Sequence, residues 1–114
     1  MPRVLSYTAV KPEKVTEGAA GLQVRWLITL KDGAEHFAMR LFEVEPGGYT
    51  PLHKHSWEHE VFVLEGEGEI FNGETTTPFR QGDAVFIHPW ETHQFRNKSG
   101  GQLKFLCLIP NTGR

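Results

Sequence analysis

Three histidines, His53, His55 and His59, fall close together in this chain and could bind a metal ion. Residues i and i+2 of a β-strand point to the same face about 6.6 Å apart, so His53 and His55 can hold one ion between them. A straight strand would carry His59 about 13 Å beyond His55, too far to share an ion whose ligand bonds measure about 2.0 to 2.2 Å. The chain must therefore bend at residues 56–58, with the first two histidines ending one strand and His59 opening the next.

Short strands are the elements that would position these histidines. Runs rich in Val, Ile, Phe, Trp and Leu are separated by Gly, Pro and Asn turn signals, and no segment keeps a helical period. This pattern predicts an all-β, antiparallel barrel or sandwich. Asn72 and Gly73 form the strongest hairpin signal and predict a two-residue type I′ turn. The expected strands cover residues 22–30, 37–45, 59–64, 68–71, 84–88, 93–97 and 102–109.

The spacing around the three histidines resembles a known family motif. Residues 47–66 read Gly47-x5-His53-x-His55-x3-His59-x6-Gly66. They look like the first motif of the cupin superfamily, G-x5-H-x-H-x3-E-x6-G, with His in place of the usual Glu.

A second stretch, residues 82–97, resembles the second cupin motif, G-x5-P-x-G-x2-H-x3-N. The outer spacing agrees, as Gly82-x10-His93-x3-Asn97. His88 stands at the usual Pro position and Trp90 at the inner Gly, so we expect a differently shaped turn before His93. The stretches at residues 40–42, 46–48, 57–60 and 105–110 resemble those of small single-domain bacterial cupins whose metal is held by four histidines.

This resemblance implies one cupin domain over residues 1–114, folded as an antiparallel jelly roll, also called a double-stranded β-helix. Asn97 completes the second motif, and its place before the turn at residues 98–100 predicts a structural role, bonding backbone there. The resemblance also implies that the metal ligands are His53, His55, His59 and His93.

Four neutral ligands would leave a divalent ion its full charge and, in six-coordination, two open positions for water, dioxygen or substrate. This is a catalytic layout, although a closed four-coordinate Zn would be structural. We expect one ion per chain. The resemblance implies Mn or Fe, while imidazole ligands leave Zn, Ni and Cu open. Because binding needs neutral imidazoles, we expect acid below about pH 6 to release the ion.

Five further residues are candidates for the lining of the pocket around the ion. Arg40 and Phe42 alternate along one strand, and an inward Arg40 could anchor a substrate carboxylate, whereas an outward one would form a surface pair. Phe105 and Cys107 share a face of the last strand, where Cys107 is either a polarisable pocket wall or a small core hydrophobe. Trp57 would either rim the pocket or pack against a sheet.

Composition narrows the classes of partner. The 114 residues carry 12 Lys and Arg against 14 Asp and Glu, a formal charge of -2, so no basic stripe is available for nucleic acid. No apolar run approaches the roughly 20 residues that cross a bilayer, so no membrane partner is expected. Cys107 is the single cysteine, and no signal-like segment opens the chain at residues 1–10, which favours the cytoplasm.

The strands at 22–30 and 102–109 are apolar on both faces. In the second, Leu106 and Leu108 face away from Phe105 and Cys107. A terminal segment could cover these outer faces, or two copies could pack through them, and we expect a homodimer.

These features favour a metal-dependent oxidoreductase, dioxygenase-like, that acts on a small organic molecule at an apolar four-histidine site. A metal-assisted isomerase or lyase is an alternative, although the sequence offers no obvious general base beyond His88 or a carboxylate. A cupin that only binds or senses a small molecule is the non-enzymatic alternative.

Overall fold

The computed structural model describes residues 1–111. Over these residues the chain forms nine strands and two short 3-10 helices, η1 (Tyr7–Ala9) and η2 (Leu30–Asp32). Neighbouring strands are antiparallel throughout. The strands are β1 (Glu13–Val15), β2 (Ala20–Ile28), β3 (Phe37–Tyr49), β4 (His59–Glu65), β5 (Glu67–Phe71), β6 (Thr76–Arg80), β7 (Ala84–Ile87), β8 (Gln94–Asn97) and β9 (Leu103–Pro110).

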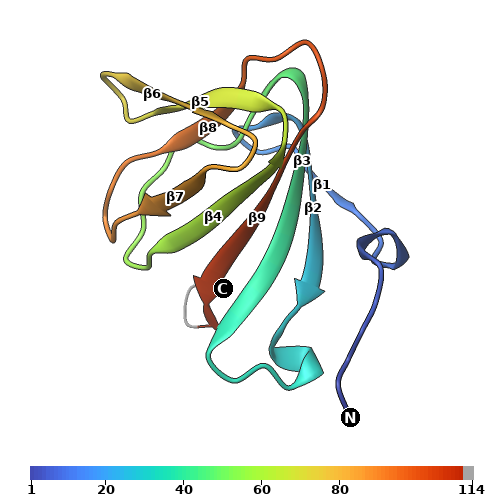
Figure 1. Ribbon diagram of the computed structural model, residues 1–114. Helices are drawn as coiled ribbons and strands as arrows, with labels where there is room; N and C mark the ends of the chain where they lie inside the picture. Colours follow the sequence, from blue (N-terminus) through green and yellow to red (C-terminus); the bar gives the residue numbers. More distant parts are fainter. Residues whose placement is uncertain (112–114) are drawn as a thin grey trace.

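One sheet, in the order β6-β5-β8-β3-β9-β4-β7, curls so that its two ends face each other, as Figure 1 shows. The long strand β3 makes this possible: it pairs with β2 and β9 along most of its length and with β8 at Tyr49. Phe95 of β8 then stacks on Phe105 of β9, with ring centroids 4.8 Å apart. The expected all-β antiparallel fold is confirmed.

Three glycines of the motifs take a backbone conformation that other residues disfavour. Gly47, Gly66 and Gly82 have φ values of 78°, 88° and 91°, in the left-handed region. At Gly66 a Cβ would also lie 2.6 Å from the carbonyl oxygen of Gln102. Gly66 and Gly82 therefore form turns between strands, whereas Gly47 lies within β3.

Each of the seven expected strands is present, with shifted ends. β3 continues to Tyr49 instead of ending at residue 45, because Gly47 and Gly48 stay in the strand as it crosses between the two halves of the sheet. A register shift between β2 and β3 at Ala20 and Leu22 marks this bend. β1 was not expected, because its three residues are too few and too polar to show a period.

The hairpin predicted at Asn72 and Gly73 forms between β5 and β6, but its predicted two-residue type I′ turn is wrong. Residues 72–75 make a longer loop. The Asn72 side-chain oxygen accepts the N–H groups of Glu74 and Thr75 at 2.9 and 2.8 Å. These side-chain bonds favour a longer Asx-type turn, with only Gly73 at positive φ.

The core lies between the facing halves of the sheet. Phe105, Leu41, Leu103, Val44 and Val63 are its largest fully buried side chains. Because β3, β4 and β9 alternate inward and outward residues, one face of each strand fills this core.

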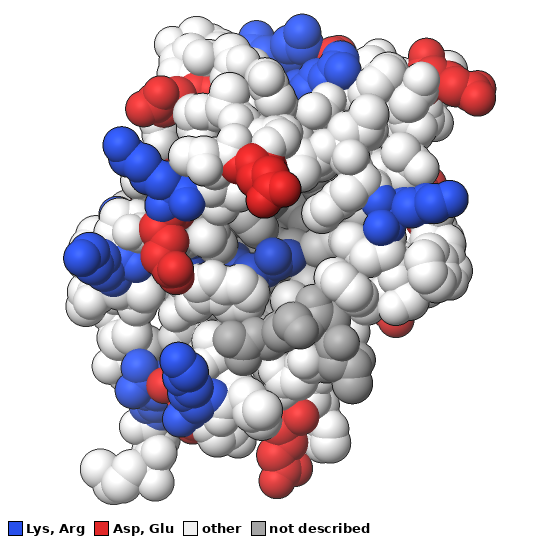
Figure 2. Space-filling model, turned by 180° about the vertical axis from the view of Figure 1, so that it is seen from behind, with Lys and Arg blue, Asp and Glu red and all other residues white. Residues whose placement is uncertain are grey.

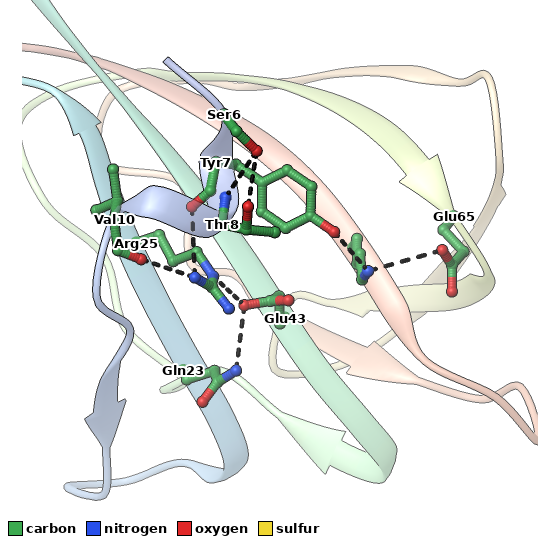
Figure 3. A network of polar contacts seen from close by, with 9 residues as sticks. Ser6, Tyr7, Thr8, Val10, Gln23, Arg25, Glu43 and Glu65 are labelled. Atoms are coloured by element: carbon green, nitrogen blue, oxygen red, sulfur yellow. Dashed lines mark hydrogen bonds and ion pairs between the residues drawn. The ribbon is translucent and has the colours of Figure 1, made fainter.

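The N-terminal segment covers the outer face of β2 and β3, where Figure 3 shows the contacts. Arg25 Nε donates to Glu43 Oε1 at 2.7 Å, and its Nη1 donates to the carbonyl oxygens of Val10 at 2.7 Å and Tyr7 at 3.3 Å. Lys104 Nζ lies 5.4 Å from the centre of the Tyr7 ring. A terminal segment therefore covers one of the two apolar outer faces noted in the sequence.

The other outer face, across β3, β9, β4 and β7, carries an apolar groove of about 410 Å³, which we call the outer groove. Phe62 and Phe86 remain 46% exposed there. Glu60 is the one charged side chain in its lining. The lining residues are Met39, Glu60, Val61, Phe62, Ala84, Val85, Phe86, Leu106 and Leu108.

Charged side chains of both signs are scattered over the face of the molecule drawn in Figure 2, with no continuous band of one sign. Across residues 1–111, no helix has the length and apolar character that a membrane span requires.

Candidate metal centre

Four histidines converge where two connections of the sheet meet. His53 and His55 lie in the connection that follows β3, His59 is the first residue of β4, and His93 directly precedes β8. His53 and His93 exchange two backbone hydrogen bonds, of 3.1 and 2.9 Å, which join the connections. The expected bend at residues 56–58 is present, but β3 ends at Tyr49, so His53 and His55 follow a strand instead of ending it.

The cluster is compact enough for one ion. One ligand nitrogen of each histidine lies within 4.8 Å of those of the others. An ion with bonds of about 2.1 Å separates adjacent ligands by about 3.0 Å and opposite ligands by about 4.2 Å. His55 Nε2 and His59 Nε2 are 2.8 Å apart, close to the adjacent spacing. The four side chains could therefore hold a metal ion.

Backbone carbonyls orient two of the rings. His55 Nδ1 lies 2.8 Å from the oxygen of Trp57, and His93 Nδ1 lies 2.8 Å from the oxygen of Glu91. A carbonyl can only accept, so each Nδ1 carries the hydrogen and each Nε2 presents a lone pair. This tautomer is the one that a metal-ligating histidine needs.

His59 is oriented by two residues from neighbouring strands. Its Nδ1 lies 2.9 Å from Cys107 Sγ and 3.2 Å from Arg40 Nη2. With Nε2 facing the cluster, Nδ1 carries the hydrogen and donates to the sulfur. Arg40 Nη2 donates to the same sulfur at 3.0 Å. Cys107 thereby fixes the His59 ring from β9.

Burial keeps the cluster neutral. Desolvation, followed by the charge of Arg40, lowers the pKa of His59 to about 2. Desolvation and the neighbouring histidines lower the pKa of His53 to about 4. Desolvation also lowers the pKa of His55 and of His93. Neutral imidazoles are available to a metal ion without the release of a proton at neutral pH.

An apolar cavity of about 220 Å³ opens beside the cluster. Of the five residues considered for a pocket, Arg40, Phe42, Phe105 and Cys107 line it. Trp57 does not, because its ring stacks on His55 at 4.1 Å with an interplanar angle of 4°. The lining comprises Val15, Leu22, Val24, Trp26, Arg40, Phe42, Thr50, Pro51, His53, His59, His93, Phe95, Phe105 and Cys107.

Sequence reasoning did not single out the cavity residues contributed by β1, β2 and the start of the loop after β3. Val15, Trp26 and Thr50 are examples. Trp26 pairs with Arg40 across β2 and β3, which places the two on one side of the sheet. The alternation of Val24 and Trp26 was the available signal, but it could not say which inner face held the cavity.

The remaining histidines lie outside the cluster. His88 is exposed, with Nδ1 3.3 Å from Glu91 Oε1, and His36 is exposed beside Glu35. Burial raises the pKa of the Cys107 thiol.

The turn before His93 places Trp90, which stands at the inner glycine position of the family motif, in the left-handed region of φ. Trp90 adopts φ 65°, the only positive φ of a non-glycine residue described. Its N–H donates to the carbonyl oxygen of His55 at 2.7 Å, which ties the turn to the loop that carries His55. Its ring is 64% exposed.

Asn97 has the structural role expected of it. The side chain is 2% exposed, and its amide donates to the oxygens of Val44 at 2.8 Å and Gly101 at 2.9 Å. Its Oδ1 accepts from Ser99 N at 2.9 Å and Ser99 Oγ at 2.8 Å. One side chain thus joins β3 to the turn after β8.

Comparison with known proteins places these features in a family context. Residues 40–109 match the family described as Cupin domain. The chain is 31% identical over 111 residues to the oxalate-binding protein of Thermotoga maritima, covering 93% of this chain and 92% of that protein.

A second curated relative is 1-methylthio-D-xylulose 5-phosphate methylsulfurylase of Rhodospirillum rubrum, 38% identical over 71 residues. That match covers 62% of this chain and 46% of the relative, so the chain spans about half of its length. Among solved structures, the polyketide cyclase RemF from Streptomyces resistomycificus superposes with a TM-score of 0.90 at 39% identity, covering 97% of this chain and 80% of that one.

Proposed function

Since the chain belongs to the cupin domain family, we propose that it is a metal-dependent enzyme that acts on a small enolisable carbonyl compound. The observation that carries this proposal is the convergence of four neutral histidines on one point beside an apolar cavity of about 220 Å³. The 39% identity to a polyketide cyclase over 97% of this chain supports carbonyl chemistry, because ring closure of a polyketide joins the carbon beside one carbonyl, reacting as an enolate, to the carbon of another carbonyl.

The proposed ligands are His53, His55, His59 and His93, with one divalent ion per chain. Such an ion would act as a Lewis acid that polarises a carbonyl oxygen and stabilises negative charge on it. Four imidazoles bring no negative charge, so the site retains a stronger attraction for an anionic oxygen than one with a carboxylate ligand. We propose Mn or Fe as the ion, with Zn, Ni and Cu as the alternatives that the elemental analysis below separates.

The chain's own residues would orient the site and keep it dry. Backbone carbonyls and Cys107 hold three of the imidazole rings through their Nδ1 hydrogens. Phe42 and Phe105, stacked at 5.2 Å, form an apolar wall of the cavity. An apolar wall strengthens electrostatic interactions within the cavity.

Oxidation by dioxygen, the dioxygenase-like oxidoreductase expected from the sequence, is the second candidate. The observation that favours it is that, among the residues the structure describes, the cavity lining contains no carboxylate that could act as a general base. Proton transfer therefore depends on the acidity of the substrate itself, whereas oxidation would need no such base.

One experiment separates these candidates. Protein purified without tag or chelator is analysed for metal, and aliquots are reloaded with Zn, Mn or Fe. Each is mixed with a 1,3-diketone in D2O, with and without dioxygen. Deuterium exchange at the central carbon, followed by NMR, in the Zn protein without oxygen supports carbonyl chemistry. Oxygen consumption that needs Mn or Fe supports the oxidoreductase.

His59→Ala should abolish metal retention and either activity, while His88→Ala, outside the cluster, serves as the matched control. Binding of the diketone without exchange or oxidation in any metal form would contradict both enzymatic candidates. It would leave the non-catalytic binding module, the class to which the name of the oxalate-binding relative points.

We further propose a homodimer that packs through the outer groove. Phe62 and Phe86 are half exposed there, and Leu106 and Leu108 of β9 complete an apolar surface. A patch of this kind on a sheet face favours a partner, and a second copy presents the same patch across a two-fold axis. Phe62→Glu should convert a dimer into a monomer in sedimentation, whereas Leu64→Glu, which does not line the groove, should not.

Two broader proposals follow the sequence. We propose one cupin domain over residues 1–114, supported by the single sheet that β1 to β9 form. We propose a cytoplasmic location, supported by the one cysteine, Cys107, which is free and buried. Fractionation of cells that produce the untagged chain tests the location.

A further inference from the structure

Arg40 brings a positive charge into the cavity beside the histidine cluster. It sits on β3, opposite Trp26 on β2 and Cys107 on β9. Its guanidinium carbon lies 5.3 Å from the centre of the Trp26 ring and 4.8 Å from that of Phe42. Aromatic faces therefore hold the cation inside an apolar space.

In the part of the chain that the structure describes, no carboxylate balances this charge. Arg3, Arg25 and Arg96 each form an ion pair, and Arg80 is exposed to solvent, whereas no carboxylate oxygen of residues 1–111 lies within 4.0 Å of the partly buried Arg40 guanidinium. Among the residues that line the cavity, Arg40 carries the only permanent charge. Placing a cation in an apolar site without a counter-ion is costly, so the arrangement calls for an anion from outside the described chain.

The guanidinium also has unused hydrogen-bond donors. Within the described chain only its Nη2 has polar contacts, with His59 Nδ1 and Cys107 Sγ. Because His59 Nδ1 carries a hydrogen, only the sulfur can accept a hydrogen bond from Arg40. Arg40 Nε is buried with no hydrogen-bond partner. A planar guanidinium matches a carboxylate through two parallel N–H···O bonds, a geometry that Arg provides and Lys does not.

The cavity also constrains the rest of the ligand. Phe42, Phe95 and Phe105 line it as a stack of rings with Phe105 in the middle, and the volume of about 220 Å³ admits only a small molecule. Because Arg40 contacts the Nδ1 side of His59, away from the Nε2 that faces the cluster, an anionic group paired with Arg40 would lie apart from the side of His59 that faces the cluster.

We propose that Arg40 is a specificity-determining residue that selects small planar organic carboxylates for this cavity, pairing with the carboxylate while the rest of the ligand lies against the phenylalanines. This inference rests on the proposed function for the identity of the site, and it names the substrate class. The carboxylate pairs with Arg40 alone, so it does not require the metal.

The test uses the full-length, metal-free protein at pH 7.5 and measures binding of benzoate by calorimetry and by ligand NMR. Benzamide, a neutral molecule of the same shape, is the matched probe. We expect benzoate to bind at least about tenfold more tightly than benzamide, the effect of a hydrogen-bonded charge pair. Arg40→Met should remove this preference for benzoate. Arg40→Lys keeps the charge but lacks the two parallel N–H donors of the guanidinium, so it should show a smaller preference than the natural chain.

Folding of the variants is checked independently. Because Arg40 lacks a counter-ion, Arg40→Met should leave the urea midpoint of the metal-free protein unchanged or raise it. If Arg40→Met fails to fold, the inference is tested by the Arg40→Lys variant and by the comparison of benzoate with benzamide in the natural chain. Equal binding of benzoate and benzamide to the natural chain, or an unchanged preference in a folded Arg40 variant, would overturn the inference.

Failure of the carboxylate site and failure of the proposed enzymatic function give different results. Benzoate preference that depends on Arg40, in a protein inactive with every metal, upholds the carboxylate site and rejects the enzyme. Diketone exchange by the metal-loaded protein without any benzoate preference upholds the enzyme and rejects Arg40 as the specificity residue.

Discussion

Lowering the pH should destabilise the metal-free protein through its buried histidines. The His59 side chain is 7% exposed, and burial with the adjacent Arg40 lowers its pKa to about 2, whereas histidine in an unfolded chain titrates near 6.5. Below pH 6.5 the unfolded chain therefore binds a proton that the folded chain does not. Stability is fully present above pH 6.5 and is lost as the pH falls toward the folded-state pKa.

The size of the effect follows from the unfolded-state pKa alone. At 1.36 kcal/mol per pH unit, His59 by itself should cost about 2 kcal/mol of unfolding free energy between pH 7 and pH 5. This figure does not depend on how far below 5 the folded pKa lies. Burial lowers the pKa of His55 and His93 as well, so the free energy of unfolding should fall by more than the contribution of His59 alone.

Urea unfolding of chelator-treated protein at pH 7, 6 and 5 measures this slope. His59→Gln should reduce the loss by about 2 kcal/mol, and His36→Gln, at an exposed histidine outside the cluster, is the control. A loss of less than about 1 kcal/mol between pH 7 and 5 in the natural chain would refute the argument that burial keeps these imidazoles neutral. For the loaded protein, release of the ion by acid below about pH 6 stays a prediction, which metal analysis after equilibration at pH 5 tests.

Three substitutions test other parts of the fold by urea unfolding. Asn97→Ala should lower the free energy of unfolding by about 3 kcal/mol, because it removes the hydrogen-bond partners of buried backbone groups. The control Asn72→Ala, at an exposed turn, should lower it by about 1 kcal/mol, and equal losses would contradict the buried role of Asn97. Trp90→Gly should be about 1 kcal/mol more stable than Trp90→Ala, because both lose the ring but only glycine relieves the φ of 65°; a more stable alanine variant would show that the turn is not strained. Glu43→Ala should cost about 3 to 5 kcal/mol by leaving Arg25 unpaired, and should speed proteolysis of residues 1–10; an unchanged proteolysis rate would show that the pair does not hold that segment.

Much of the fold and of the candidate site could be predicted from local sequence. The spacing of His53, His55 and His59 required a bend that the structure contains, because backbone geometry sets how far apart alternating residues fall. The glycines at 66 and 82 marked turns, because each occupies a φ that other residues disfavour, whereas Gly47 has such a φ but lies within β3. The role of Asn97 was also predictable from its place before a turn.

Specific hydrogen bonds accompany the shape of two turns. Trp90 stands where the family motif has glycine, and its left-handed φ of 65° accompanies a hydrogen bond from its backbone N–H to the backbone oxygen of His55. Asn72 and Gly73 suggested a two-residue turn, but the Asn72 side chain captured two backbone N–H groups and lengthened the loop. Neither contact is visible in the spacing of residues.

The sequence by itself determined which residues could ligate a metal and that short antiparallel strands would carry them, because both follow from distances along the backbone. Only the tertiary structure decided what surrounds them. Cys107 reaches His59 because β9 pairs with β4, and Arg40 reaches Cys107 because β3 pairs with β9. The absence of a carboxylate beside Arg40 in the described chain depends on every strand that lines the cavity, since a counter-charge could have come from any of them.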